Sequence, residues 1–591
     1  MHAPPIDTPF DRSAMLDRLA TETFDIVVVG GGITGVGIAL DAASRGLRAA
    51  LVERGDFASG TSSKSSKLVH GGLRYLQQGE VRLVYEALHE RQRLRKNAPH
   101  LVRVMPFMIP ILTKDGLIPP RIARVLGTSM WMYDLTGGWR IGKLHKRLKK
   151  LAAVKHLPTM PEARLASAYL YYDATADDAR LCLTVARTAA DHGAAVANAC
   201  AVVDISTDAD TGRANGVIVN ADGREIHVRA SVVVNAAGVW ADDVRALAET
   251  KHPDSIRPAK GVHITVPWEK VRNDIAVVIP VPKDKRSLFV VPWGPKPDGT
   301  FQHAYVGTTD TDYNGDIDDP QCTKDDIAYV LRALNAAVTT GITEADVTGV
   351  WAGLRPLVKA ASSGRTADLS RRHSITTNDA CVISVTGGKL TTYREMAEDT
   401  VDAALEQLGR RARCRTKSLK LLGAAGFREL DTASPDAHLA SRFGGEMTAL
   451  KTLIAGDPSL GEPLVEGLPY LRAEAVYAVR YEMALTLDDV LTRRTRARLF
   501  DRDATLASAG AVGALIAPEL GWDALEQQRQ IDAFIASCAH EAAAAHLTEA
   551  ELGAASEGFD IPMATPAATP AATPAATPAA TPAATPAEVH S

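Results

Sequence analysis

The chain has 591 residues, of which 46% are hydrophobic and 23% charged, a composition typical of a folded protein with a large core. Its net charge of −4 excludes a global basic signature, so no nucleic-acid partner is expected. Six cysteines without a CxxC pair argue against a disulfide framework or a zinc site, and no metal is expected. Residues 1–23 carry no apolar signal segment, and no uncharged apolar run reaches about 18 residues, so any membrane contact should be peripheral.

Residues 24–53 predict a strand, a turn, a helix and a second strand. The continuous β-branched run at 24–29 is typical of a buried parallel strand. The helix expected at 33–44 directs its N-terminal amides at phosphates, and the second strand is expected at 47–52.

A GxGxxG motif formed by Gly30, Gly32 and Gly35 lies between the first strand and the helix of this unit. In order, these glycines permit a tight turn, backbone approach to a pyrophosphate and close packing of the helix on the strand. Glu53 ends the second strand near the spacing required to bond a ribose hydroxyl. Together these features predict a dinucleotide site, and they leave NAD and FAD as alternatives.

The rest of the chain divides into a mixed region, a helical region and a tail. Strand-like and helix-like runs alternate up to about residue 415, after which Ala, Leu, Arg and Glu at helical spacing predict an all-helical domain at 425–558. Ala-Thr-Pro repeats at 559–591 predict a disordered tail, because regular proline prevents helix and nothing large is present to form a core. In the mixed region, helices are expected at 177–192, 324–338 and 394–408.

The hydroxyl-rich tract 61–76, Thr-Ser-Ser-Lys-Ser-Ser-Lys-Leu-Val-His-Gly-Gly-Leu-Arg-Tyr-Leu, resembles a signature of FAD-dependent glycerol-3-phosphate dehydrogenases. The resemblance covers roughly residues 24–498 and leaves out the leading segment and the tail. The other pieces that resemble this family are Lys-Gly-Val-His at 260–263, Gly-Thr-Thr-Asp at 307–310, Gly-Leu-Arg-Pro-Leu at 353–357, Thr-Gly-Gly-Lys-Leu-Thr-Thr-Tyr-Arg at 386–394 and the arginine-rich tract 488–498.

The resemblance implies an α/β fold class, with a Rossmann-like FAD-binding domain of glutathione-reductase type, an antiparallel-sheet substrate domain and an all-helical C-terminal domain. The first two domains would interleave within 24–415, with the substrate part at roughly 101–165 and 256–375, after an N-terminal extension at 1–23. It also implies oxidation of sn-glycerol 3-phosphate to dihydroxyacetone phosphate, with electrons passing from FAD to a quinone. Such proteins sit on the cytosolic membrane surface and commonly form homodimers.

Cofactor-binding residues are expected where short hydroxyls and glycines gather. Serine and threonine hydroxyls can bond phosphate and flavin oxygens, and glycines permit close backbone approach to the flavin ring. The helix expected after residue 388 would favour negative charge on a reduced flavin. Beside the motif residues already named, the expected cofactor-binding residues are Arg54, Thr61, Ser62, Ser63, Ser65, Ser66, Lys67, Gly71, Gly72, Gly388, Lys389 and Thr391.

The substrate phosphate requires fixed cations, and the oxidation requires a base. Arginine suits a phosphate by its planar fork and lysine as a point charge. Histidine has a pKa suited to a general base, so His263 is the expected base, with a structural histidine in a strand as the alternative. Arg355 is expected as a second catalytic residue and as one of the cations that bind the phosphate, because an arginine in such an apolar stretch needs an anionic partner. The motif matches assign substrate contacts to Arg74, Tyr75, Arg371 and Lys389, with Arg372 as the alternative to Arg371.

Aromatic and basic residues between 130 and 150 predict contact with an anionic membrane surface. The alternative is a solvated basic helix. The residues of this predicted patch are Met130, Trp131, Met132, Tyr133, Trp139, Arg140, Lys143, Lys146, Arg147, Lys149 and Lys150.

Three other functions compete with a quinone-linked dehydrogenase. An oxygen-using glycerol-phosphate oxidase would differ only in its electron acceptor. An amino-acid oxidase is disfavoured by the phosphate-suited cations. A non-catalytic flavoprotein scaffold would suit the helical domain and the tail, but Arg74, His263, Arg355 and Lys389 argue against it.

Overall fold

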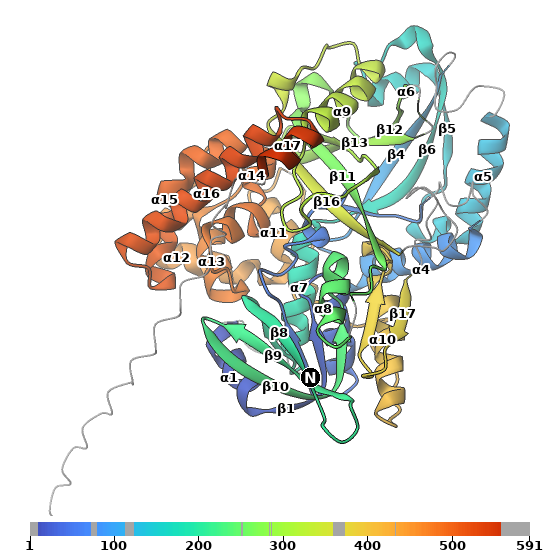
Figure 1. Ribbon diagram of the computed structural model, residues 1–591. Helices are drawn as coiled ribbons and strands as arrows, with labels where there is room; N and C mark the ends of the chain where they lie inside the picture. The colour runs from blue at the N-terminus through green and yellow to red at the C-terminus, as the bar shows by residue number, and fades with distance from the viewer. Residues whose placement is uncertain are drawn as a thin grey trace, which may run out of the picture.

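The computed structural model describes residues 10–72, 80–112, 123–249, 252–282, 284, 286–358, 373–431 and 433–556. Three parts meet at the centre of the molecule (Figure 1): a first sheet at the bottom, a second sheet at the upper right and a group of helices at the left. The chain crosses between the two sheets several times, so each sheet combines segments that are far apart in the sequence.

The first sheet is mostly parallel and carries the predicted dinucleotide unit. Its order is β17-β18-β10-β1-β2-β7, and β9 pairs antiparallel with β10 and with β8. Val27 and Val28 of the central strand are fully buried, as expected for a β-branched strand covered on both faces. The strands are β1 (Thr23–Val29), β2 (Ala49–Val52), β7 (Ala195–Ala197), β8 (Cys200–Thr207), β9 (Ala214–Ala221), β10 (Arg224–Asn235), β17 (Ser374–Thr377) and β18 (Ile383–Thr386).

Helix α2 (Ile33–Ser44) follows β1 and packs against α7 (Asp178–Asp191) and α10 (Tyr393–Gln407). All three helices confirm the sequence prediction to within one or two residues. Part of the leading segment that we expected as an extension belongs to this first part. It forms α1 (Arg12–Thr21), which buries Leu16 and Leu19 against the sheet.

The second sheet is antiparallel except for one pair among its described strands, because β4 and β12 run parallel. It extends beyond the predicted boundaries, since β3 comes from the hydroxyl-rich tract and β6 runs past residue 165. The strands are β3 (Leu68–Val69), β4 (Arg103–Leu112), β5 (Lys146–Lys149), β6 (Leu165–Thr175), β11 (Ile256–Pro267), β12 (Ala276–Pro280), β13 (Ser287–Pro295), β14 (Phe301–Gly307), β15 (Thr311–Asp312) and β16 (Gly349–Val358). The helices beside this sheet are α4 (Val81–Asn97), α5 (Ala123–Thr136), α6 (Lys150–His156) and α9 (Lys324–Ala337), and α8 (Ala241–Ala246) follows β10.

The C-terminal region confirms the expected all-helical domain. Helices α15 and α16 pack side by side, and Asp501 and Asp523 cap their N-termini by accepting backbone hydrogen bonds. The chain then returns to the second sheet, where Leu547 O accepts a hydrogen bond from Lys324 N at 2.9 Å. The helices are α11 (Ala437–Phe443), α12 (Met447–Gly456), α13 (Arg472–Glu482), α14 (Ala497–Phe500), α15 (Arg502–Leu520), α16 (Ala524–Ala544) and α17 (Glu549–Ser556).

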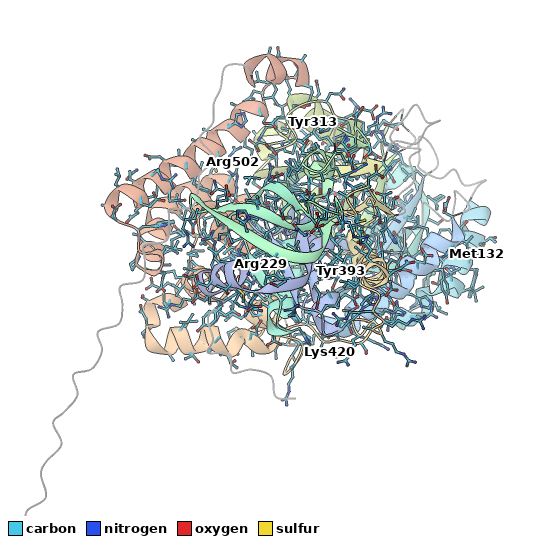
Figure 2. All side chains as sticks on the ribbon, turned by 60° about the horizontal axis from the view of Figure 1, so that its bottom comes forward. Met132, Arg229, Tyr313, Tyr393, Lys420 and Arg502 are labelled. Atoms are coloured by element: carbon cyan, nitrogen blue, oxygen red, sulfur yellow. The ribbon has the colours of Figure 1, made fainter. Side chains whose placement is uncertain are left out.

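The predicted membrane-facing patch is only partly a surface. Met130 and Tyr133 are buried, whereas Trp131 and Met132 of α5 are exposed, and Figure 2 shows Met132 at the outer edge of the molecule. Part of the basic run forms strand β5, so this run is not a basic helix. The side chain of Trp139 lies outside the described part of the chain. Within that part, none of the helices combines the length and apolar character that crossing a bilayer requires.

Candidate active site

A first cavity of about 350 Å³ lies where β1, β2 and β10 end and α2 begins. Ligands of open α/β sheets bind at this edge, where the positive end of a helix dipole favours phosphate. The predicted residues that line the cavity are Gly30, Gly32, Glu53, Arg54, Thr61, Ser62, Ser65, Gly388 and Lys389.

Gly35 supports this cavity from behind. A Cβ atom at Gly35 would lie 1.9 Å from the carbonyl oxygen of Gly30, so only glycine lets α2 approach β1 this closely. The first turn of the helix is also tied to the hydroxyl-rich tract, because Ile33 N donates to Ser62 Oγ at 2.9 Å.

The carboxylate of Glu53 shapes the glycine turn. Its two oxygens accept hydrogen bonds from Gly31 N at 2.6 Å and Gly55 N at 2.8 Å. Burial raises the pKa of Glu53, and these amide hydrogen bonds oppose the rise by favouring the charged form.

Trp240 lines the first cavity and was not predicted. The guanidinium carbon of Arg54 lies 4.5 Å from the centroid of the Trp240 ring, and the indole Nε1 donates to Asp318 Oδ1 at 2.6 Å. The sequence carried one usable signal, the run Asn-Ala-Ala-Gly at 235–238. It ends β10, a third parallel strand that reaches the same edge of the sheet as β1 and β2.

A second cavity of about 490 Å³ lies against the second sheet. It shares Thr61, Ser65, Gly388 and Lys389 with the first cavity, so the two form one continuous cleft that suits an elongated ligand. The predicted residues that line the second cavity are Thr61, Ser65, Ser66, Gly72, His263, Arg355, Gly388, Lys389 and Thr391.

His263 is held rigidly at this cavity by β11. Its ring stacks on Trp351 with centroids 4.7 Å apart and an interplanar angle of 10°, and its Nε2 lies 2.9 Å from Ser66 Oγ. Nδ1 is buried, and none of the described residues forms a hydrogen bond with it. Burial lowers the pKa of His263 well below its usual range, and the positive charges of Lys67 and Arg355 lower it further. The lowered pKa favours the uncharged imidazole, which is the form that a general base requires.

Arg355 has the anionic partner that its apolar surroundings require. Its Nη1 lies 3.2 Å from Asp310 Oδ1, and its guanidinium also donates to Thr309 O and Thr308 Oγ1 at 3.3 Å. Arg286, which was not predicted, lines the same cavity and donates to Asp310 O at 2.7 Å. Two arginines thus hold one turn at the cavity wall.

Gly71, which we expected beside the flavin ring, is not among the residues that line either cavity, and its place there stays a prediction. A Cβ atom at Gly71 would lie 2.5 Å from Leu88 Cδ2 and 2.6 Å from the Tyr133 hydroxyl, so packing alone already requires a glycine. Its amide donates to Asp173 Oδ1 at 3.2 Å, and the same carboxylate accepts from Tyr133 at 2.7 Å and from Arg91 at 2.5 Å.

Ser63 and Lys67 also line neither cavity. Ser63 is buried, and Lys67 pairs with Asp178 at 3.2 Å with its ammonium 4.5 Å from the centroid of Trp351. Both residues support the cleft from behind. The predicted residues Arg74, Tyr75 and Arg371, with the alternative Arg372, lie outside the described residues.

Known proteins show the same organisation. The family model of FAD dependent oxidoreductases matches residues 25–394, and that of the C-terminal domain of alpha-glycerophosphate oxidase matches residues 414–527. Glycerol-3-phosphate dehydrogenase 2 of Mycobacterium tuberculosis is 41% identical over 542 residues, which are 89% of this chain and 90% of that protein. The mitochondrial glycerol-3-phosphate dehydrogenase of Arabidopsis thaliana is 35% identical over 561 residues, covering 88% of this chain and 86% of its own.

A solved structure extends the similarity to three dimensions. The crystal structure of the glycerol-3-phosphate dehydrogenase from Bacillus halodurans complexed with FAD has a TM-score of 0.72 and 29% identity, covering 89% of this chain and 97% of that chain. Fold and cleft together define an FAD-dependent oxidoreductase, and the chain belongs to that family. Within it, the chain belongs to the glycerol-3-phosphate dehydrogenases.

FAD is the cofactor of this protein. The residues present fit it, because the first cavity joins the glycine turn, the start of α2 and Glu53, which are the parts that hold the dinucleotide half. The second cavity adjoins the first at Gly388 and Lys389, which would hold the flavin end of the cofactor.

Proposed function

We propose that the chain oxidises sn-glycerol 3-phosphate to dihydroxyacetone phosphate. One observation carries the proposal: a buried His263, whose lowered pKa favours the uncharged form, shares a cavity with cationic side chains that include Arg355 and Lys389, and this cavity adjoins the dinucleotide cavity. A phosphate-bearing alcohol matches this combination of base and cations, and the substrate in the names of the relatives is one.

Each residue has a distinct part in the proposed reaction. FAD, when bound, accepts the hydride that leaves carbon 2 of the substrate. His263 accepts the proton of the 2-hydroxyl as general base, and its stacking on Trp351 keeps the imidazole in one orientation. Arg355 and Lys389 hold the phosphate, and we propose Arg74, Tyr75 and Arg371 for the same pocket on the strength of the motif matches.

Glycerol 3-phosphate added without oxygen should bleach the flavin absorbance of the holoenzyme. Glycerol should bleach it far more slowly, because it lacks the phosphate that Arg355 and Lys389 bind. The measurement is anaerobic absorbance spectroscopy with glycerol 3-phosphate, glycerol and a panel of amino acids. Full FAD occupancy without bleaching by glycerol 3-phosphate would favour a non-catalytic scaffold, and bleaching by an amino acid would favour an amino-acid oxidase.

We propose a quinone as the electron acceptor. Oxygen is the alternative acceptor, because residues 414–527 match the C-terminal domain of an oxidase. The substrate-reduced enzyme is mixed in a stopped-flow instrument with a short-chain quinone or with air-saturated buffer. Faster reoxidation by the quinone supports a dehydrogenase. Faster reoxidation by oxygen, with release of hydrogen peroxide, would identify an oxidase.

We further propose a peripheral position on an anionic, cytosolic membrane surface, where a quinone would be reached. Exposed apolar side chains gather near the basic run on α5 and around β5. Trp131 is 55% exposed, Leu135 75% and Leu151 72%, and Lys146 and Lys149 stand exposed among them. Aromatic and aliphatic side chains beside lysines suit the interface of such a membrane.

Replacing the six cations of this patch with glutamine should abolish binding to vesicles that contain anionic lipid, because each cation contributes about 1 kcal/mol near such a surface. The measurement is vesicle flotation, and the six cations are Arg140, Lys143, Lys146, Arg147, Lys149 and Lys150. The control variant replaces an equal number of exposed cations at a different edge of the molecule, where Figure 2 labels Lys420. These are Arg410, Arg411, Arg413, Arg415, Lys417 and Lys420. Unchanged flotation of the patch variant would exclude the proposed surface.

A further inference from the structure

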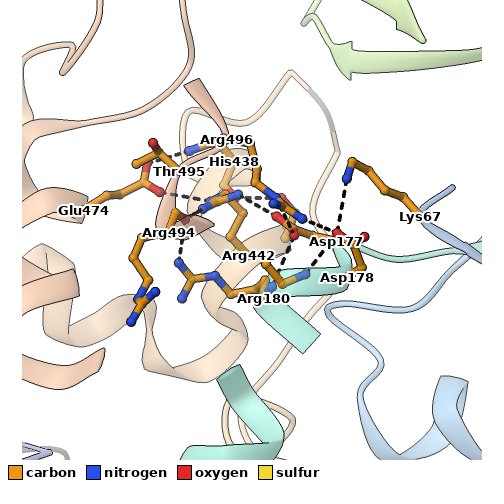
Figure 3. A network of polar contacts seen from close by, with 12 residues as sticks. Lys67, Asp177, Asp178, Arg180, His438, Arg442, Glu474, Arg494, Thr495 and Arg496 are labelled. Carbon is orange, nitrogen blue, oxygen red and sulfur yellow. Dashed lines mark hydrogen bonds and ion pairs between the residues drawn. The ribbon is translucent and has the colours of Figure 1, made fainter. Parts of the chain in front are cut away.

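A network of buried ion pairs joins the helical domain to the start of α7 (Figure 3). Several of its arginines only fasten one part of the protein to another. Arg494, for example, binds Asp56 at 2.5 Å and Glu482 O at 2.7 Å. Arg496 is different, because its contacts lead to the hydroxyl-rich tract that borders both cavities.

Arg496 is held in one conformation. Its side chain is 1% exposed, and its backbone has a φ of 82°, which a residue other than glycine keeps only when its surroundings enforce it. Nε donates to Asp177 Oδ1 at 3.1 Å, and Nη2 donates to Ser63 O at 3.2 Å and to Asp178 Oδ1. Nη1 donates to Thr492 O at 3.3 Å, so the planar guanidinium spans four acceptors that a point charge could not reach together.

Asp178 connects Arg496 to the hydroxyl-rich tract through hydrogen bonds with Ser65. Its side chain is fully buried, and Oδ2 accepts hydrogen bonds from Ser65 N at 3.0 Å and Ser65 Oγ at 2.7 Å. Its Oδ1 pairs with Lys67 Nζ at 3.2 Å. A buried carboxylate keeps its charge only with such partners, so the cations and Ser65 determine one position for Asp178.

Ser65 and Ser66 connect this network to the reacting centre. Ser65 lines both cavities, and its carbonyl accepts from Trp351 Nε1 at 3.1 Å, the indole on which His263 stacks. Ser66 Oγ lies 2.9 Å from His263 Nε2, and the Ser66 carbonyl accepts from Tyr305 at 3.0 Å. A shift of the tract would therefore move both the partner of the base and the wall of the cleft.

We propose that Arg496, in the C-terminal helical domain, is a positioning residue for the oxidation, and that it acts through Asp178 on Ser65 and Ser66. The inference rests on the proposed function, because it assigns Arg496 a part in that reaction. It follows that the active site is incomplete without the helical domain, although every residue that lines the two cavities comes from the other two parts of the protein.

The test compares Arg496→Ala with Arg498→Ala in the full-length holoenzyme. Arg498 is a matched control, because it is also buried, while its partners Asp488, Ser537 and Glu541 all belong to the helical domain. The rate constant of anaerobic flavin reduction at saturating glycerol 3-phosphate should fall about 100-fold in Arg496→Ala, a loss typical of a misplaced reacting group. The FAD content and the reduction of the flavin by dithionite should stay at the wild-type level in both variants. Arg498→Ala should keep a rate near that of the wild type.

Two further variants separate positioning from folding. Arg496→Lys keeps the positive charge and can still pair with Asp178, so its rate of flavin reduction should lie between those of Arg496→Ala and the wild type. If Arg496→Ala does not fold, the rate of Arg496→Lys tests the inference in its place. In a double-mutant cycle, Arg496→Ala is combined with Asp178→Asn. The double variant should reduce its flavin only slightly more slowly than Asp178→Asn alone, because both substitutions break the same chain of contacts. The visible circular dichroism of the bound flavin should change in Arg496→Ala and not in Arg498→Ala, with no substrate present.

A wild-type rate in FAD-loaded Arg496→Ala or Arg496→Lys would overturn the inference, and so would an equal loss in Arg498→Ala. Additive losses in the double-mutant cycle would exclude a route through Asp178. If the wild-type flavin is reduced by dithionite but not by glycerol 3-phosphate, the proposed function fails. The circular dichroism of the variants then still decides whether Arg496 positions the flavin site.

Discussion

Replacing His263 with glutamine should slow flavin reduction by glycerol 3-phosphate about 10²- to 10⁴-fold, the usual contribution of a general base. Glutamine can keep a hydrogen bond to Ser66, but its amide accepts no proton in the neutral range. The imidazole is buried against Trp351 and Gly307, so few groups could take over its role. The rate is measured by anaerobic stopped-flow absorbance, and the ratio of flavin to protein absorbance shows whether FAD remains bound.

His303 supplies the matched control for this variant. It lies on the neighbouring strand β14, packs edge-on against Phe500 at 5.5 Å and lines neither cavity. His303→Gln should reduce its flavin at the wild-type rate. A normal rate in His263→Gln would reject His263 as the base and leave it as a structural histidine.

The protonation of His263 sets the expected pH dependence. Burial, Lys67 and Arg355 all lower its pKa, so the form able to accept a proton persists below the pH at which an ordinary histidine becomes charged. The rate constant at saturating substrate should therefore hold its value as the pH falls from about 8 to about 6.5, where an unperturbed histidine is half protonated. A rate constant halved at that pH would contradict the lowered pKa.

The second large effect is expected at Arg355. Removing one partner of a partly buried charged pair costs about 2–5 kcal/mol, so Arg355→Met should lower kcat/KM roughly 30-fold to several thousand-fold. The loss should be greatest in the apparent affinity for glycerol 3-phosphate, because Asp310 would then repel the phosphate that Arg355 attracts in the wild type. Arg355→Lys should recover only part of the affinity, since lysine lacks the planar fork.

Arg257 provides a comparison at similar exposure. Its side chain is 28% exposed against 25% for Arg355, and it pairs with Asp312 away from both cavities, so Arg257→Met should keep wild-type kinetics. In Arg355→Met the loss of a nearby positive charge should also raise the pKa of His263 and move the acid limb of the rate profile to higher pH. Unchanged kinetics in Arg355→Met would remove it from the substrate pocket.

The dinucleotide unit could be predicted in detail because its determinants are local. A β-branched run, three spaced glycines and a helix of small and apolar residues act within a few residues of one another, and the helix expected at 33–44 is α2. The helical domain followed from periodicity in the same way. The strand β5 could not be predicted, because its polar residues form a strand only through pairing with β6.

The cleft was predicted only in part, since residue type does not show which side of a tract faces a cavity. Ser65 and Ser66 line the cleft, whereas Ser63 and Lys67 of the same tract support it from behind. Trp240 was missed because its partners, Arg54 and Asp318, come from distant segments.

The sequence by itself therefore determined the cofactor class and the candidate base. The spacing of the glycines indicated a dinucleotide, and the motif at 260–263 indicated His263 as the base. Only the tertiary structure decided how that chemistry is held in place. The stack of His263 on Trp351 and the reach of Arg496 to Asp178 join residues far apart in the chain. Such contacts depend on how the sheets and the helical domain pack, and no local pattern in the chain specifies them.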